Sequence, residues 1–275
     1  MVGLFLDNNS YHFHYFGKRK TIVLLNGLFA SFQSWDSVIK DLVKDFNVLQ
    51  LNFHGQGVLK FEDLSKVSLE CHVQQVASLI NQLEIEKACF LGLSHGGRVA
   101  LGMASLYPHL VESLIVANTY LNPDQALYSK LNSWLLANEE VGGQHRFEVA
   151  LPWVWGRTFL EQNKELIQFY KERSHLIDIK LSSCLIEQAK EEFPFDFSNF
   201  SGSLYVVSSN EDLLTPYFYQ QEIMSREDIQ GTSFHFEIDG GHASLIEFPQ
   251  QTIDLCQIWN EHNDYSKNEE VNNVV

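Results

Sequence analysis

Short apolar runs alternate with helix-like segments through about the first 120 residues, and this alternation limits the folds open to the chain. Four runs are continuous and rich in aliphatic or β-branched residues, as are strands buried on both faces of a parallel sheet. These runs are 21–27 (TIVLLNG), 47–52 (NVLQLN), 88–93 (ACFLGL) and 113–118 (SLIVAN). The order predicts an α/β fold with a mostly parallel central sheet flanked by helices.

Local signals add detail at the start of this region. Residues 2–6 (VGLFL) and 11–16 (YHFHYF) flank the turn formers DNNS and predict a β-hairpin at one edge of the sheet. Ser34 and Ser68 each precede a segment with apolar residues at intervals of three and four. Both serines are therefore expected to cap helices.

The alternation stops between residues 120 and 200, a stretch with helical spacing and three of the five tryptophans. Strand-like runs resume at 203–208 (SLYVVS) and 233–238 (SFHFEI), so one domain interrupted by an insertion explains the pattern. The expected parts are a first core segment (1–119), a helical cap insertion (120–200), a second core segment (201–262) and a flexible acidic tail (263–275).

Composition excludes several classes of function. The formal net charge is −16, which opposes sequence-independent binding to nucleic acid or anionic membranes. No apolar stretch approaches the ~20 residues that span a bilayer, and the first residues lack the features of a signal peptide. We therefore expect a cytoplasmic protein without membrane insertion. The four cysteines form no C-x-x-C pair, no nucleotide-binding glycine motif is present, and neither a metal nor a cofactor is implied.

Residues 90–97 (FLGLSHGG) place Ser94 between Gly92 and Gly96, after a predicted strand and before a predicted helix. A strand–turn–helix context is typical of a nucleophile elbow, in which a tight turn exposes the serine hydroxyl. The alternative is a plain turn that contains a serine. The nucleophile hypothesis requires a base and an acid elsewhere in the chain, because a neutral hydroxyl is a poor nucleophile.

Later strand ends supply both groups. Asp212 follows the run 203–208, and His242 follows the last predicted strand in a glycine-flanked loop. Glu211 and Asp239 compete for the role of the acid, but the turn and proline after Asp212 favour that residue. Two backbone N–H groups must also stabilise an oxyanion, and we expect them from His95 and from Leu28 in the loop after the first parallel strand.

These motifs resemble those of the α/β-hydrolase superfamily over essentially the whole chain except the tail. The matching segments are NGLF (26–29), NFHGQG (52–57), GLSHGG (92–97), NEDLLTP (210–216) and GGHA (240–243). The resemblance implies a cap over the site and a Ser94–Asp212–His242 triad. Asn26 and Asn52 depart from the His and Asp that many members have there. The Asn26–Gly27 loop is similar to that of acyltransferases that make hydroxyacyl lipid precursors.

The leading hypothesis is therefore a serine hydrolase that cleaves an ester, thioester or lactone through an acyl-enzyme on Ser94. One alternative is an acyltransferase that passes a hydroxyacyl or other acyl group to an alcohol; another is a non-enzymatic ligand receptor on the same fold. Predicted substrate-binding residues are Asn26, Phe29, His54, Trp134, Trp153 and Trp155.

The expected partner is a small acyl ester or thioester, with an acyl carrier protein or a coenzyme A thioester as possible donors. Docking an acidic carrier protein on a chain of charge −16 would require a basic patch on the cap. Its candidate members are Arg146, Arg157, Lys164, Lys171, Arg173 and Lys180.

Overall fold

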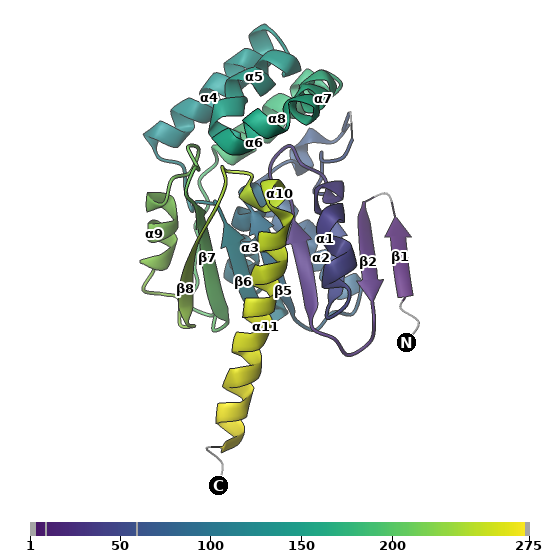
Figure 1. Ribbon diagram of the computed structural model, residues 1–275, viewed down its shortest axis with the longest axis vertical. Helices are drawn as coiled ribbons and strands as arrows, with labels where there is room; N and C mark the ends of the chain where they lie inside the picture. The colour runs from purple at the N-terminus through teal and green to yellow at the C-terminus, as the bar shows by residue number, and fades with distance from the viewer. Residues whose placement is uncertain (1–3, 9, 59, 273–275) are drawn as a thin grey trace.

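Eight strands form a single sheet in the described part of the chain, in the order β1-β2-β4-β3-β5-β6-β7-β8 (Figure 1). The computed structural model describes residues 4–8, 10–58 and 60–272, with side chains for 10–58 and 60–262. The strands are β1 (Leu4–Asn8), β2 (Tyr11–Tyr15), β3 (Thr21–Leu25), β4 (Asn47–Leu51), β5 (Ala88–Leu93), β6 (Val111–Ala117), β7 (Ser203–Ser209) and β8 (Ser233–Ile238).

The sheet is parallel from β4 to β8, whereas β2 pairs antiparallel with both β1 and β4. The predicted parallel strands and the edge hairpin are thus confirmed. Asp7 and Asn8 pair with His12 and Tyr11, so they belong to strand β1 and not to the predicted turn. Val2 and Gly3, the start of the predicted hairpin, lie outside the described residues.

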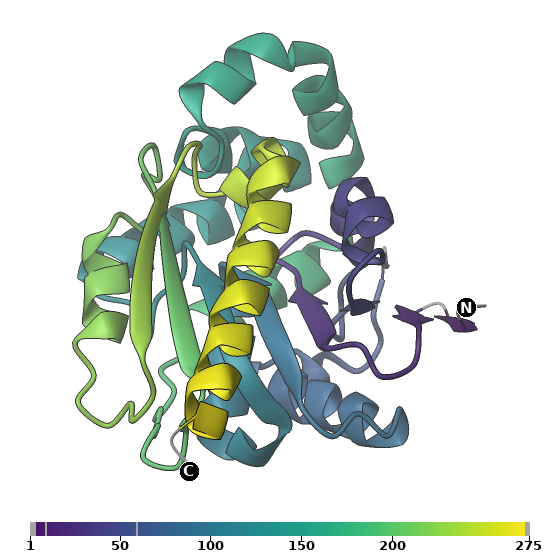
Figure 2. The same ribbon diagram turned by 60° about the horizontal axis from the view of Figure 1, so that its bottom comes forward.

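Helices cover both faces of the sheet, which explains why β3, β4 and β5 are buried along their whole length (Figures 1 and 2). The core helices are α1 (Asp36–Leu42), α2 (Leu69–Gln82), α3 (His95–Leu106), α9 (Phe218–Met224), α10 (Ser244–Glu247) and α11 (Pro249–Asn272), with 3₁₀ turns at Phe32–Trp35, Leu64–Lys66 and Pro108–Leu110. On the face of the sheet covered by α1 and α11, the core includes Trp35 and Trp259. On the other face, α2, α3 and α9 contribute Val73, Val99 and Ile223 to the core. In the described part of the chain, no helix combines the length and apolarity needed to cross a bilayer.

The two predicted caps have different outcomes. Ser68 accepts a hydrogen bond from the Cys71 N–H at 3.2 Å and caps α2, as predicted. Ser34 caps no helix, because the chain turns earlier, in the 3₁₀ segment that follows extended Ser31. The Ser34 N–H instead donates to the Ser31 carbonyl at 2.9 Å, inside that turn.

Five further helices separate β6 from β7 and lie over the carboxyl ends of the parallel strands, at the top of Figure 1. They are α4 (Gln125–Glu140), α5 (Gly143–Val154), α6 (Arg157–Gln162), α7 (Lys164–Ser174) and α8 (Ile179–Ala189). This is the predicted helical cap. The exact boundaries between the core segments, the cap and the tail remain predictions. Helix α11 continues to Asn272, into the segment 263–275, whose predicted flexibility stays a prediction.

Candidate active site

Ser94 occupies a strained turn between β5 and α3. Its φ of 56° and ψ of −116° lie in a region that non-glycine residues rarely adopt. Two bonds from the neighbouring strand end hold the turn: the Ser94 N–H donates to Ala117 O at 2.9 Å, and the Thr119 hydroxyl donates to Ser94 O at 2.7 Å. A strained residue that its surroundings hold in place is typical of a functional turn.

The flanking glycines are required by close backbone contacts. A Cβ on Gly92 would lie 2.3 Å from Gly96 O, directly across the turn. A Cβ on Gly96 would lie 2.2 Å from Leu25 O, at the end of the adjacent strand β3. The motif therefore sets the elbow's own shape and also its distance from the loop after β3.

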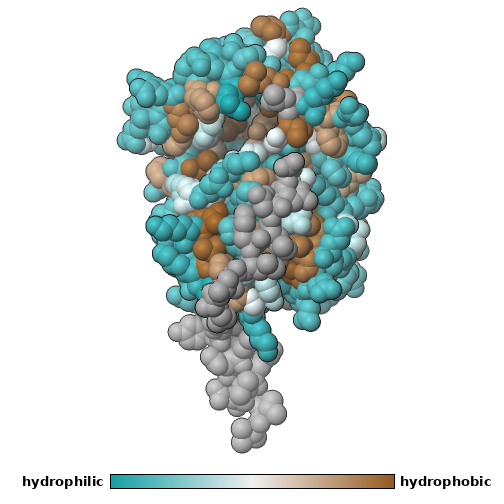
Figure 3. Space-filling view, turned by 90° about the vertical axis from the view of Figure 1, so that its right-hand side faces the viewer, coloured by the Kyte–Doolittle hydropathy of each residue, from teal (hydrophilic) through white to brown (hydrophobic). Residues whose placement is uncertain are grey.

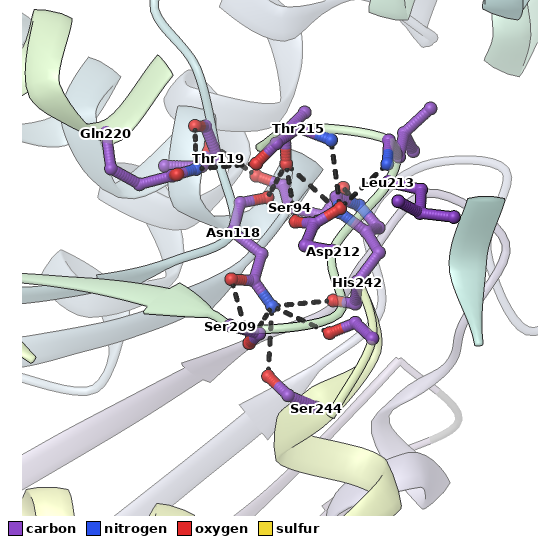
Figure 4. A network of polar contacts seen from close by, with 12 residues as sticks. Ser94, Asn118, Thr119, Ser209, Asp212, Leu213, Thr215, Gln220, His242 and Ser244 are labelled. Carbon is purple, nitrogen blue, oxygen red and sulfur yellow. Dashed lines mark hydrogen bonds and ion pairs between the residues drawn. The ribbon is translucent and has the colours of Figure 1, made fainter. Parts of the chain in front are cut away.

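The structure brings together the side chains of Ser94, Asp212 and His242, from the ends of β5, β7 and β8 (Figure 4). Ser94 Oγ lies 2.7 Å from His242 Nε2, and His242 Nδ1 lies 3.0 Å from Asp212 Oδ2. Glu211 instead accepts a hydrogen bond from the Arg157 N–H, and Asp239 accepts one from Asn210. Of the three candidate acids, Asp212 is thus the one that contacts the histidine.

Several donors hold the Asp212 carboxylate in place. Oδ1 accepts the N–H groups of Leu214 at 2.8 Å and Thr215 at 2.9 Å, and Oδ2 accepts the Thr215 hydroxyl at 2.9 Å. The Thr215 hydroxyl also lies 3.0 Å from Asn118 O. With His242 Nδ1–H donating to Oδ2, the imidazole presents Nε2 to Ser94 as an acceptor.

Asn118, at the end of β6, positions the histidine loop. Its side-chain amide points toward the carbonyl oxygens of Gly241 and His242, at 3.2 and 3.0 Å, and toward the hydroxyls of Ser209 and Ser244, at 2.8 and 2.9 Å (Figure 4). The residue has a positive φ of 48°, which asparagine tolerates better than most residues. Sequence reasoning missed it; the available signal was an asparagine at a predicted strand end.

The loop after β3 and the start of α3 meet beside the serine. A Cβ on Gly27 would lie 3.9 Å from Ser94 Cβ, so this loop lies against the elbow. Among the described residues (4–8, 10–58 and 60–272), neither the Leu28 N–H nor the His95 N–H donates to another group. Two unused donors at this point are what an oxyanion hole requires.

The His95 side chain belongs to a buried chain of hydrogen bonds. His72 Nε2 lies 3.1 Å from the His54 carbonyl, which can only accept, so Nε2 carries the proton. His72 Nδ1 then accepts from His95 Nε2 at 2.9 Å, and His95 Nδ1 faces the Gln188 amide of α8 at 3.4 Å. Both imidazoles are neutral in this arrangement. Sequence reasoning did not identify His72.

Burial lowers the pKa of His72 to about 3 and holds the pKa of His95 well below its usual value. Below pH 6.5 these residues take up protons in the unfolded chain but not in the folded one. Stability is therefore expected to fall with falling pH, by up to about 1.4 kcal/mol per pH unit for each histidine. Urea denaturation at pH 7, 6 and 5 measures this slope. His72→Gln should reduce it, and an unchanged slope would contradict the assignment.

Glu247 joins the cap to the histidine loop. Its buried carboxylate accepts the N–H of Gly156, between α5 and α6, at 3.0 Å and that of Gly241 at 3.1 Å. The Ala243 N–H donates to Val154 O of the cap at 2.9 Å. Burial raises the pKa of Glu247, although these donors favour its ionised form. The loop that carries the histidine is therefore anchored to the cap.

Core and cap enclose a cavity of about 710 Å³, and Ser94 and His242 lie in its wall. Most of the other lining side chains are apolar, and the exposed ones, including Val58 and Phe169, mark its mouth. The face drawn in Figure 3 is mainly hydrophilic, with hydrophobic residues breaking it in several places, including the upper part where the cap lies. An apolar cavity with a few polar groups is typical of a small-molecule site.

Three of the predicted substrate-binding residues, Phe29, Trp134 and Trp155, line this cavity, and three do not. Asn26 is buried behind the wall, where it accepts from the Trp35 indole N–H at 2.8 Å and donates to Leu51 O at 2.7 Å. His54 and Trp153 are also absent from the wall. For these three residues, substrate binding stays a prediction that the cavity wall does not support: the His54 ring stacks on Phe61, and Trp153 lies under the Lys130 ammonium.

Three of the six candidate members of a basic docking patch on the cap are buried or lie beside a carboxylate. Arg146 is only 3% exposed, so it cannot contribute to a protein-docking surface. Lys171 pairs with Glu148, and Arg157 lies 3.6 Å from Glu161. Docking of an acidic carrier protein therefore stays a prediction, and it would depend on the other three candidates, Lys164, Arg173 and Lys180.

Comparison with known proteins agrees with this architecture. A family model described as "alpha/beta hydrolase fold" matches residues 20–249. The chain is 25% identical over 249 residues to a Pantoea ananatis protein named "Putative carbamate hydrolase RutD", covering 87% of this chain and 88% of that one.

Solved structures show the same likeness. The crystal structure of MGS-M2, an alpha/beta hydrolase enzyme from a Medee basin deep-sea metagenome library, superposes with a TM-score of 0.77 at 25% identity, covering 89% of this chain and 91% of the other. A thermophilic esterase from Thermogutta terrifontis shares the fold, with a TM-score of 0.73 at 18% identity over 95% of this chain and 99% of its own.

Proposed function

This chain belongs to the α/β-hydrolase family, and from that premise we propose that it is a serine hydrolase acting on a carboxylic ester, thioester or lactone. The observation that carries the proposal is the hydrogen-bonded series Ser94–His242–Asp212 at the wall of an apolar cavity. A nucleophile, a base and an orienting acid in that order are what acyl transfer to serine needs.

The proposed reaction has two halves. Ser94 Oγ attacks the carbonyl carbon while His242 Nε2 takes the hydroxyl proton, and Asp212 stabilises the imidazolium. The tetrahedral intermediate then collapses, and the leaving alcohol or thiol receives that proton from His242. A water molecule, deprotonated by His242, attacks the acyl-enzyme and releases the acid and free Ser94.

Charge that develops on the carbonyl oxygen is proposed to be stabilised by the N–H groups of Leu28 and His95. The first residue of α3 also offers the positive end of the helix dipole to the same point. Because the cavity wall is largely apolar, these donors would act in a medium of low dielectric constant, where they are worth more than in water.

Hydrolysis is favoured over acyl transfer by one structural detail. The sequence feature that suggested a transferase was Asn26, yet its side chain is buried behind the cavity and bonded to Trp35 and Leu51. It therefore cannot contact an acyl acceptor in the cavity. The feature that suggested acyl transfer therefore does not reach the acyl-enzyme, and we propose water as the acceptor that completes the reaction.

A fluorophosphonate probe and a substrate panel test the proposal. The probe should label the native protein and not Ser94→Ala, because the reagent reacts with an activated serine. The panel comprises 4-nitrophenyl esters, acyl thioesters, lactones and, given the named relative, carbamates. Hydrolysis of at least one class by the native protein alone is expected. Equal labelling of both proteins would refute the proposal, and product formed only with an added alcohol would indicate a transferase.

A further inference from the structure

Arg146, on cap helix α5, lines the cavity but has no counter-charge. It is 3% exposed, and within residues 10–58 and 60–262 no carboxylate forms an ion pair with it and no acceptor takes a hydrogen bond from it. Its Nε is fully buried without a partner. Buried charges are normally paired, so this guanidinium has an unmet requirement for an anion.

A buried arginine with a structural role looks different in this same protein. The guanidinium of Arg98 is also buried and its Nη1 has no partner, but its Nε donates to the Leu121 carbonyl at 3.1 Å and its Nη2 to the Glu191 carbonyl at 2.8 Å. Arg146 makes no such bonds and instead lies over the Phe29 ring, 3.8 Å from its centroid. Burial lowers the pKa of Arg146 to about 10, which leaves it cationic at neutral pH.

Two neighbours place this cation in the reaction chamber. Phe29 directly follows Leu28, one of the two proposed oxyanion donors, and both line the cavity that contains Ser94. Trp134 lines the same cavity, and its buried indole N–H likewise has no acceptor within residues 10–58 and 60–262. The chamber therefore holds a buried cation, Arg146, and a second unused donor, with no described acceptor for either. The wall contains one more arginine, Arg173, but that residue is exposed and lies over the Phe169 ring, 5.4 Å from its centroid.

We propose that Arg146 binds an ionised carboxylate of the substrate, so that the preferred substrate is an ester or thioester carrying a second, free carboxylate. This inference rests on the proposed hydrolase function. A monoanion fits Arg146 best, because this one buried guanidinium balances one negative charge and its planar fork matches a carboxylate, whereas Arg173 is exposed to solvent. The apolar remainder of the wall suits the carbon chain between the two groups.

Matched neutral and anionic substrates test the proposal. One pair is the 4-nitrophenyl half-ester of adipic acid and its terminal amide; homologues two carbons shorter and longer vary the chain length. A second pair, the butanoyl esters of 4-hydroxybenzoate and 4-hydroxybenzamide, carries the charge on the leaving group. In at least one pair, kcat/KM for the carboxylate should exceed that for the amide by about 10- to 100-fold.

Arg146→Met should reduce that ratio to less than about threefold, whereas Arg146→Lys should retain part of it because the charge remains. Arg157→Met is the matched control: it removes an exposed arginine from the same cap, outside the cavity, and should leave the ratio unchanged. Equal ratios in the native protein and Arg146→Met, or a native preference for the amide, would overturn the inference.

Two further readouts separate this inference from a structural role and from the proposed function. Arg146→Met should match or exceed the native Tm, because it removes an unpaired buried charge. A lower Tm together with an unchanged carboxylate-to-amide ratio of kcat/KM would show that Arg146 only supports the structure. In Ser94→Ala, calorimetry should detect adipate monoamide but not adipamide, and Arg146→Met should abolish this difference. That binding test stands even if no ester is hydrolysed, whereas absent fluorophosphonate labelling would refute the hydrolase proposal itself.

Discussion

Ser94→Ala is expected to lower kcat/KM for any hydrolysed ester by about 10⁴-fold or more, with little change in stability. The substitution removes the attacking oxygen and the hydrogen bond to His242 Nε2, but it leaves the elbow's backbone bonds to Ala117 and Thr119 intact. Removing a triad nucleophile leaves only the catalysis that the oxyanion donors and substrate binding supply. Initial rates and thermal denaturation of the two proteins measure both effects.

His242→Ala should cause a loss of similar size, and the double variant should lose little more than either single variant. Groups that act as one unit are strongly non-additive, because removing one of them already disables the others. Losses that multiply in the double variant would show that the two residues act independently. A Ser94→Ala protein within tenfold of native activity would contradict the proposed nucleophile.

Gly96→Ala is expected to destabilise the protein by about 3 kcal/mol or more. Alanine in the interior of a helix normally gains up to ~1 kcal/mol over glycine. Here the added methyl would meet the Leu25 carbonyl at 2.2 Å and the Asn26 carbonyl at 2.7 Å, and both belong to backbone that cannot rotate away. The steric cost should therefore exceed the helix-propensity gain, because α3 must move away from β3.

Gly27→Ala is the matched control for this prediction. Its added methyl would meet only ordinary contacts, at 3.8 Å from Leu93 O and 3.9 Å from Ser94 Cβ. We expect a change within about 1 kcal/mol, against a fall in Tm of roughly 6–12 °C for Gly96→Ala in a chain of this size. Similar melting temperatures for the two variants would show that the elbow tolerates side chains and that its shape does not require glycine.

The two substitutions probe separate parts of the site. Ser94 supplies chemistry and contributes little packing, whereas Gly96 supplies no chemistry and sets the spacing between the elbow and the loop after β3. If Gly96→Ala folds, its loss of activity should follow from displaced oxyanion donors. Fluorophosphonate labelling of this variant would then be slow but not abolished, because Ser94 and His242 remain.

Much of the core was predictable because its elements depend on local patterns. The run 88–93 was predicted as a strand and forms β5 with the same bounds, and the run 233–238 does the same as β8. A continuous apolar run needs helices on both faces of a parallel sheet wherever the rest of the chain lies. Ser68 caps α2 for an equally local reason, since its bond reaches only three residues ahead.

The meeting of Ser94, Asp212 and His242 was anticipated for a topological reason. Parallel strands all present their carboxyl ends at one edge of a sheet, so polar residues just after several strands must gather there. The choice of the triad acid among Glu211, Asp212 and Asp239 could not be made from strand order alone. It depended on a contact across 30 residues, between the Asp212 carboxylate and His242 Nδ1.

The sequence alone was therefore sufficient for the order of the core strands and for the placement of Ser94, Asp212 and His242 at the active edge, but it missed Asn118 there and misplaced the cap at Ser34. Only the tertiary structure decided which side chains face the cavity: it buries Asn26 behind the wall, joins His72 to His95, and turns Arg146 inward to an unpaired position. The physical reason is one of range. Strand and helix patterns are set by neighbours a few residues away, whereas burial and pairing depend on which distant segments pack against each other.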